Sequence, residues 1–293
     1  MATANKLLPS KAAVLPLGPV LYSRQYQDQL NNILRLYFNQ IDSVTQTLAA
    51  NVGGRFLGFP YGEYLDTTNQ VAGSDTSAYA MRLNTSVSFS GISIGNRIAS
   101  FAATITNGAA SAGTTLTVTV IIPGDVIYLG MELTGTGIAA GTRILSFISG
   151  TGGIGTYTVN ISQLIPSPLV GTVQMTGSLP SQIRAEFPGI YNVQLAAQFV
   201  NASASTVDVD VWFRKNEANI SNSNCIFTVP PNGQLVAAFS FIIEIRAADS
   251  VEIMWHTAST DTYLGYTGPA VSPVRPATPS VIASMNFVSS LPA

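Results

Sequence analysis

Charge is what this sequence has least of. Only 10% of its 293 residues are Asp, Glu, Lys or Arg, against roughly 25% in an average soluble domain. The 13 basic and 15 acidic residues leave a formal net charge of −2, so no basic surface is expected to neutralise a phosphate backbone and nucleic acid is excluded as a partner. A surface this neutral is typical of a chain whose faces are covered by other subunits.

Cysteine and histidine are almost absent, with one residue each, Cys225 and His256. A single cysteine excludes an internal disulfide, and a single histidine excludes a multi-histidine metal site. No serine or cysteine beside His256 lies in a recognisable nucleophile context. We therefore expect no catalytic residue, no cofactor and no metal ligand, and a protein that is not an enzyme.

Asp208 and Asp210 are the carboxylate pair closest to a catalytic or cation-binding pattern. They share one face of a predicted strand, about 7 Å apart. Carboxylates that hydrolyse glycosides come from different elements around a cleft, so ion pairing with Arg214 and Lys215, or solvation, is the favoured interpretation. A calcium site with further oxygen ligands stays as an alternative.

Long apolar runs are also missing, although the mean hydropathy is +0.31. Residues 144–183 carry no charge, but Gly, Pro and hydroxyl residues interrupt them, so no membrane-spanning helix is expected. The apolar residues near the N-terminus are broken by Pro9, Pro16 and Pro19, which is unlike the continuous core of a secretory signal.

The glycines of "GTGGIG" (150–155) match the spacing of a dinucleotide-binding fingerprint. That fingerprint needs a helix to begin within the glycines, whereas here the alternating, β-branched "TYTVNIS" follows. A hairpin loop is therefore predicted, and likewise for "GTGIAAGT" at 135–142.

After a Pro-punctuated arm at 1–22, residues 23–52 predict an amphipathic helix that Ser23 caps and that Gly53 and Gly54 end. Its apolar face either packs on its own domain or docks on a partner, and both interpretations stay open. The residues assigned to docking or oligomerisation are Leu30, Ile33, Leu34, Tyr37, Ile41 and Val44.

From near residue 78, apolar and polar residues alternate with a period of two, which predicts an antiparallel β-sandwich or barrel. Residues 53–97 are expected to hold a linker and the first strands, and 177–293 the remaining strands. Between them, 98–176 are rich in Gly and Thr and nearly uncharged, which predicts a small inserted β domain.

Four segments give the C-terminal half a recognisable order: "FPGIYNVQLAAQF", "VDVWFRKNEANI", "FIIEIRAADSVEIMW" and "SMNFVSSL". Together they resemble the C1q/TNF-like jelly-roll family, in which a Gly-x-Tyr strand opens the series, as Gly189 and Tyr191 do here. Glu217 and Ala248 stand where that family usually has glycine. The resemblance covers 78–97 and 178–291, and it implies a mainly β, antiparallel jelly-roll sandwich.

The helix after an arm and the Gly/Thr-rich insert are similar to segments of tailed-bacteriophage virion proteins, including those of marine and cyanobacterial phages. The resemblance implies a homotrimer on the capsid surface, synthesised in the host cytoplasm, that binds the major capsid protein as a decoration (cement) protein. The alternative is a head or tail fibre that binds a host-surface glycan.

These expectations assign roles to aromatic residues of the sandwich. Trp212, Tyr263 and Tyr266 are the candidate partner or glycan contacts. The residues assigned to the jelly-roll core or to a trimer contact are Tyr191, Phe199, Phe213, Phe241, Trp255 and Phe287.

Overall fold

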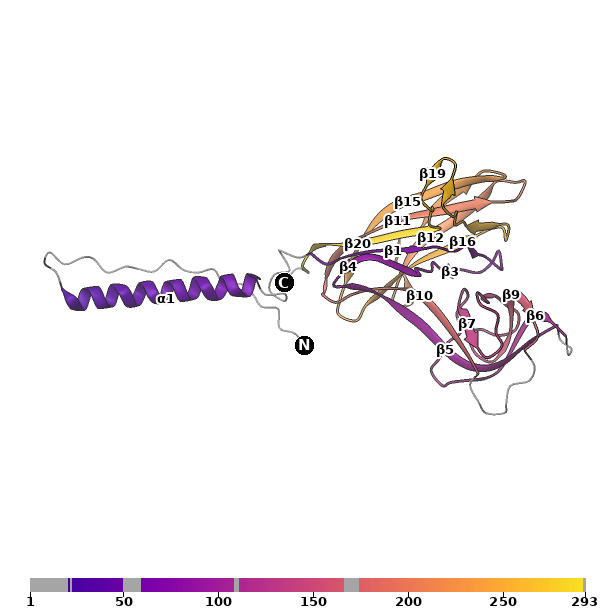
Figure 1. The fold of residues 1–293 in the computed structure, drawn as a ribbon, viewed down its shortest axis with the longest axis horizontal. Helices are drawn as coiled ribbons and strands as arrows, with labels where there is room; N and C mark the ends of the chain where they lie inside the picture. Colours follow the sequence, from indigo (N-terminus) through magenta and orange to yellow (C-terminus); the bar gives the residue numbers. More distant parts are fainter. Residues whose placement is uncertain (1–20, 22, 50–58, 108–110, 166–173, 292–293) are drawn as a thin grey trace. The chain divides into compact units, whose positions relative to one another are not determined.

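The computed structural model describes residues 21, 23–49, 59–107, 111–165 and 174–291 (Figure 1). The chain divides into two compact units, 1–59 and 60–293, which are described separately. The arm at 1–20 and the predicted stop at Gly53 and Gly54 lie outside the described residues. In the described part, no helix is long and apolar enough to cross a membrane.

The first unit contains one described helix, α1 (Arg24–Ala49). It begins at Ser23, whose hydroxyl accepts a hydrogen bond from the Tyr26 backbone N–H at 3.3 Å. This contact satisfies one of the donors that a helix leaves free in its first turn. The helix is about 39 Å long at 1.5 Å per residue.

Seven apolar residues of α1 form one half-exposed stripe. Leu36 and Phe38 lie off it, with 55% and 57% of their surfaces exposed. No described residue of the helix is buried. The half-exposed members of the stripe are Tyr26, Leu30, Ile33, Leu34, Tyr37, Ile41 and Val44.

The second unit is built almost entirely of strands. Its first ten are β1 (Tyr61–Asp66), β2 (Gln70–Val71), β3 (Tyr79–Ala80), β4 (Thr85–Ser90), β5 (Ile92–Thr106), β6 (Gly113–Ile121), β7 (Glu132–Gly135), β8 (Ile144–Phe147), β9 (Gly155–Gln163) and β10 (Met175–Ala185). The others are β11 (Gly189–Asn201), β12 (Val207–Lys215), β13 (Ala218–Asn219), β14 (Cys225–Val229), β15 (Gly233–Ile245), β16 (Ser250–Thr257), β17 (Thr262–Leu264), β18 (Ala270–Val271), β19 (Val274–Arg275) and β20 (Val281–Ser289).

Strand order identifies the architecture. One sheet contains the neighbours β4, β1, β20, β11 and β15, and the other contains β14, β12, β16, β10 and β5, all paired antiparallel. From β11 onward the chain passes repeatedly from one sheet to the other, as Figure 1 shows. This is an antiparallel jelly roll, and the fold class predicted from the sequence is confirmed.

The core of the sandwich is filled by the inward rows of the strands. β11 alternates with period two, and Tyr191, Val193 and Phe199 are buried on its inward side. Phe213 of β12 stacks against Phe241 of β15, with ring centroids 5.5 Å apart. The aromatic rings of both sheets therefore interlock between the layers.

Two strands, β5 and β10, run without a break from the sandwich into the insert. The expected boundaries at 97/98 and 176/177 fall inside β5 and β10, which pair from Ile92↔Ala185 to Phe101↔Met175. Figure 1 shows this ribbon leading to β6, β7 and β9. Buried residues of the insert, such as Phe101 and Tyr157, belong to the same apolar cluster as the jelly-roll core. Period-two alternation alone could not reveal that each strand serves both lobes.

Residues 79–83 lie where the ribbon leaves the sandwich. Met81 N–H donates to the Ile253 carbonyl and Leu83 N–H to the Pro180 carbonyl, both at 2.8 Å. The segment therefore lies between β16 and β10 and completes the sheet at the point where β10 diverges, beside a proline that has no N–H to offer.

The glycine motifs lie in loops, as predicted. "GTGGIG" connects β8 to β9, which pair antiparallel, and Gly152 adopts φ +106°. In the 135–142 segment Gly137 and Gly141 both adopt φ +79°. These are conformations that glycine supplies without steric cost.

Candidate functional site

The outward rows of β1, β4, β11, β15 and β20, which we call the outer face, form a candidate interface. The β11–β15 register places Asn192 opposite Ile242 and Gln198 opposite Val236, and residues opposite each other share a face. Ile242 is 63% exposed and Val236 is 52% exposed. Other members are Tyr61, Glu63, Leu65, Ser88, Ser90, Ile190, Gln194, Ala196, Ala238, Ser240, Glu244, Ile282, Ser284 and Asn286.

The outer face is nearly neutral. In the rows just named, Glu63 and Glu244 are the charged residues. The others are amides, hydroxyls, small residues and aliphatic side chains, which cost little to remove from water when their polar groups find partners. Sequence reasoning missed this face because it followed the inward phase of the same strands. The available signal was the scarcity of charge on the opposite phase.

The residues assigned to core or trimer contact lie inside the molecule. Tyr191, Phe199 and Phe213 are fully buried, as is Trp255 at 1% exposure. Phe241 and Phe287 are half-buried against the same core. All six therefore pack between the sheets of one chain and do not form the outer face.

A groove of about 410 Å³ surrounds Trp212; its lining residues are Asp210, Trp212, Asn219, Ile220, Asn222, Asn224 and His256. We call it the Trp212 groove. The Trp212 indole N–H donates to the side-chain oxygen Oδ1 of Asn219 at 2.8 Å. Asp210 accepts a hydrogen bond from the Asn224 amide at 2.9 Å. The indole is thereby held in place beside amide and carboxylate groups.

His256 and Asp210 form a contact at the floor of this groove. His256 Nδ1 lies 3.2 Å from Asp210 Oδ2, and His256 Nε2 lies 2.7 Å from the Asp75 carbonyl. Because both ring nitrogens have oxygen neighbours, neither is directed at a reacting group. In the described part of the chain, no cluster of three or more His, Cys, Asp or Glu could hold a metal ion.

The other sequence candidates lie apart from this groove. Asp208 accepts a hydrogen bond from Thr228 at 2.7 Å, while Arg214 pairs with Glu252 and Lys215 with Asp249. Of the two expected alternatives, ion pairing with Arg214 and Lys215 is not found, because both cations have other acidic partners, whereas Asp208 is exposed to solvent, in keeping with the other alternative.

Tyr263 and Tyr266 are half-exposed and do not line the Trp212 groove. Tyr263 lies in β17, opposite Val71 of β2. The Tyr266 backbone N–H donates to the Asn69 side chain at 2.8 Å. The structure therefore does not bring these two tyrosines together with Trp212 in one groove.

Residues 91–95, with Ser93 at the centre, match the G-x-S-x-G pattern of serine nucleophiles. In nucleophile elbows this motif joins a strand to a helix. Here Gly91, at φ +66°, joins β4 to β5, and Ser93 lies within strand β5. The strand–turn–strand geometry does not build a nucleophile elbow.

A buried ion network lies where the insert meets the sandwich. Arg97 contacts both oxygens of Glu252, at 2.7 and 2.6 Å, and donates to Glu217 at 2.7 Å. Arg214 and Ser181 donate to the same Glu252 carboxylate. Burial raises the pKa of Glu252, but the hydrogen bonds from Arg97 and Ser181 outweigh it and lower that pKa to about 2.

Comparisons with known proteins bear on the fold alone. No protein-family model and no curated protein matches the chain. A crystal structure of murine APRIL at pH 5.0 is similar over 54% of this chain and 97% of that chain, with 10% identity and a TM-score of 0.25. A Bacillus thuringiensis Cry1Da tryptic core variant is similar over 79% and 51%, with 10% identity and a TM-score of 0.16. The jelly-roll assignment rests on the strand order described above.

Proposed function

We propose that this chain is a non-catalytic assembly protein that forms a homotrimer through its outer face. The supporting observation is the row of exposed aliphatic residues, Val236 and Ile242, within a face of neutral amide and hydroxyl side chains. Burying that face against a second and a third copy removes apolar surface from water without stranding charges. Of its charged members, Glu244 lies near the end of edge strand β15 and belongs at the rim, whereas Glu63 lies on β1 between β20 and β4 and needs a partner across the interface.

The helical unit is the proposed attachment device. Ile33, Tyr37 and Ile41 belong to a stripe whose members are half-exposed, and Leu36 and Phe38 are exposed beside it. In a trimer, three such helices bind as one multivalent unit, so weak single contacts give firm attachment. The occupant we propose for the stripe is the major capsid protein.

The biological setting of this proposal comes from the sequence resemblance. The proposed protein is a capsid decoration protein of a tailed bacteriophage, which attaches to the virion surface after synthesis in the host cytoplasm. Labelled antibody against the purified chain, viewed by electron microscopy on native phage particles, tests it. Label scattered over heads supports a decoration protein, and label confined to tails favours a fibre. Unlabelled particles would contradict both hypotheses.

The attachment step has its own test. Particles lacking the protein are mixed with the full chain, or with Ile33→Asp/Tyr37→Asp protein, and bound protein is measured after sedimentation. We expect the double variant to lose attachment at least tenfold, because two carboxylates interrupt the apolar stripe. Leu36→Asp/Phe38→Asp is the control off the stripe. Equal loss in both variants would show that the stripe has no special role.

A second candidate function is binding of a host-surface glycan in the Trp212 groove. Its support is the combination of an oriented indole with asparagine and aspartate side chains, since sugars stack on aromatic rings and hydrogen-bond to amides and carboxylates. Glycan-array binding by the wild type that is lost in Trp212→Ala and kept in Tyr263→Ala supports this function. If the wild-type protein binds no glycan on the array, this second function is excluded.

A further inference from the structure

His256 connects the loop between β2 and β3 to the sandwich. This loop, residues 72–78, which we call the β2–β3 loop, passes from the sheet that contains β2 to the sheet that contains β3. His256 lies on β16, opposite Asp210 of β12. Its Nε2 lies 2.7 Å from the backbone carbonyl oxygen of Asp75 in the loop, and its Nδ1 lies 3.2 Å from Asp210 Oδ2. One imidazole ring therefore joins the middle of the loop to β12.

Both oxygens that face this ring are hydrogen-bond acceptors. A carbonyl oxygen has no hydrogen to donate, and neither has an ionised carboxylate. A neutral imidazole carries one N–H, so either tautomer leaves a ring lone pair facing an oxygen lone pair, whereas an imidazolium donates to both oxygens. With Asp210 ionised, the two contacts therefore fit the charged form of His256.

The acidic groups around His256 favour the same form. Asp210 lies directly opposite it, and Asp208 follows on the same outward side of β12. Asp75 is an exposed residue of the loop, and Asp261 is an exposed residue of the turn after β16. Negative charges on these elements attract an imidazolium and stabilise it relative to the neutral ring.

The other ionisable groups near β16 are uncharged, paired or at its far end. Tyr79 of β3 lies opposite Trp255, and burial raises the pKa of Tyr79, so its hydroxyl carries no charge. Arg214, further along β12, is paired with Glu252. Strand β10 pairs with β16 at its first residues, where Arg184 lies opposite Ser250. These groups therefore leave the acidic surroundings of His256 in place.

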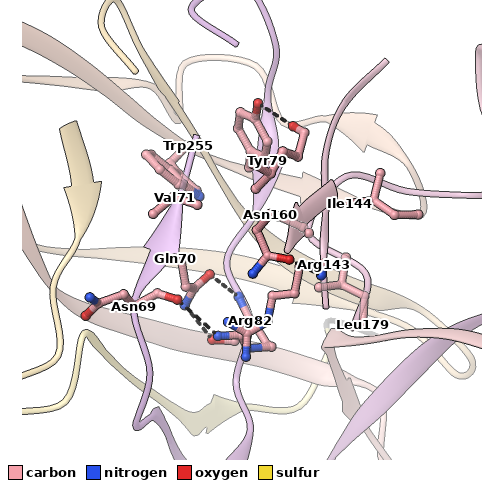
Figure 2. A pocket seen from close by; sticks show the side chains of 13 residues that line it. Asn69, Gln70, Val71, Tyr79, Arg82, Arg143, Ile144, Asn160, Leu179 and Trp255 are labelled. Atoms are coloured by element: carbon pink, nitrogen blue, oxygen red, sulfur yellow. Dashed lines mark hydrogen bonds between the residues drawn. The ribbon is translucent and has the colours of Figure 1, made fainter. Parts of the chain in front are cut away.

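The β2–β3 loop also contacts the insert. Gly73 donates its N–H to the Tyr79 hydroxyl at 2.9 Å, and that hydroxyl donates to the Leu145 carbonyl of β8 at 3.0 Å (Figure 2). A Cβ on Gly73 would lie 2.5 Å from Leu145 Cβ, so the loop backbone packs directly on β8. Ser74 and Thr76 bond to each other within the loop, whereas the His256 contact leads out of it to the sandwich.

We propose that His256 is a pH-sensitive fastener of the β2–β3 loop. As an imidazolium it binds the Asp75 carbonyl and the Asp210 carboxylate together, and it holds in place the loop that packs on the insert. Loss of its proton removes one of these hydrogen bonds, because the neutral ring has a single N–H. The loop is therefore fastened at low pH and loosens as the pH rises through the range in which histidine titrates. This device does not depend on the trimer or on the glycan site proposed above.

Hydrogen exchange of the full chain tests the proposal. Amide exchange of the β2–β3 loop is followed by mass spectrometry at about pH 5 and about pH 8, and each rate is divided by that of an unstructured peptide with the same sequence. We expect protection of the loop in the wild type to fall at least about threefold from the lower to the higher pH, because the loop opens locally once a contact is lost. Both pH values lie well above the pKa of Glu252, about 2, so the buried ion network stays intact.

Three variants locate the effect. In Asp210→Asn the new amide can donate to Nδ1 while Nε2–H donates to the Asp75 carbonyl, so a neutral His256 makes both contacts. Its loop should therefore stay protected at both pH values. Asp208→Asn is the matched control, since the Asp208 carboxylate bonds to Thr228, and it should keep the wild-type pH dependence. His256→Phe should show low protection at both pH values.

Nuclear magnetic resonance supplies a second readout. His256 is the one histidine of the chain, so the imidazole signals of untagged protein belong to it without further assignment. At about pH 5 both ring N–H protons should be visible, because hydrogen bonds slow their exchange with water, and at about pH 8 one should remain. Equal loop protection at both pH values in the wild type, or an Asp210→Asn variant that keeps the wild-type pH dependence, would overturn the proposal.

Discussion

Ala248 adopts a backbone conformation that its side chain disfavours. It lies in the turn between β15 and β16 at φ +70°, where a Cβ costs roughly 1 kcal/mol or more. We predict that Ala248→Gly raises the free energy of unfolding by about 0.5–1 kcal/mol, because relief of this strain exceeds the extra chain entropy of glycine. Urea denaturation measures the change.

The matched control for this substitution is Ala238→Gly. Ala238 is an exposed residue in the middle of β15, where glycine gains no conformational relief. It should lower the free energy of unfolding by about 0.5–1 kcal/mol. A decrease of the same size in both variants would show that the turn is not strained at Ala248.

Glu217 keeps a similar conformation for a different reason. Its φ is +68°, yet its carboxylate accepts hydrogen bonds from Arg97 at 2.7 Å and Tyr128 at 2.9 Å. These hydrogen bonds lower the pKa of Glu217. The two departures from the glycine expected at these turns therefore differ: at Glu217 a side-chain contact offsets the strain, and at Ala248 no such contact exists.

Strand β16 carries Glu252, whose carboxylate contacts three other strands. Glu252 accepts hydrogen bonds from Arg97 of β5, Ser181 of β10 and Arg214 of β12. Its pKa is near 2 in the folded chain, against an ordinary value of 4.5. A depressed pKa means that the ionised form stabilises the fold above about pH 4.5, and that this stabilisation is lost as the pH falls toward 2.

We predict that the free energy of unfolding falls by about 3 kcal/mol between pH 4.5 and pH 2 on account of Glu252. Glu252→Gln should be less stable at neutral pH, because it removes the buried carboxylate shared by Arg97 and Arg214 and leaves Arg97 with Glu217 as its remaining acidic partner, and it should show a shallower loss below pH 4.5. Urea titrations at several pH values measure both. Equal slopes in the variant and the wild type would contradict this assignment.

The sequence predicted strands only where apolar residues alternate. β11, β12, β15 and β16 follow that pattern, so their place in a jelly roll could be anticipated. β1 could not, because its inward positions are Gly62, Tyr64 and Asp66, and Asp66 is buried only through its partners Arg82 and Gln70. The Arg97–Glu252 pair spans 155 residues, and no local pattern brings such residues together.

The site was less predictable than the fold for a related reason. The sequence named Trp212 as a candidate contact, but the groove around it depends on Asn219 and Asn224 after β12 and on His256 from β16. Helix α1 could be read from its own periodicity, since its stripe needs no contact from elsewhere. Helix α1 was predictable because its periodicity is local in sequence, whereas the Trp212 groove is formed by residues that are distant in sequence.

At the scale of the whole molecule, one sheet leaves its outer face uncovered while the other carries the insert. The outer face is nearly free of charge and is built on strands whose inward rows pack in the core. The proposed function has a copy of the same chain cover this face, and rotation about a common axis would then close the assembly at a fixed number of copies.

Ile242→Arg tests this closure directly. Ile242 is 63% exposed on β15, the edge strand of the outer face beside β11, so arginine is tolerated in the monomer but would bury an unpaired charge in the proposed interface. We expect light scattering after size-exclusion chromatography to give three chain masses for the wild type and one for the variant. Ile226→Arg is the matched control, since Ile226 is 65% exposed on β14 of the other sheet, and it should remain a trimer. A wild type that is already monomeric, or an Ile242→Arg trimer of unchanged mass, would show that the outer face serves some other contact.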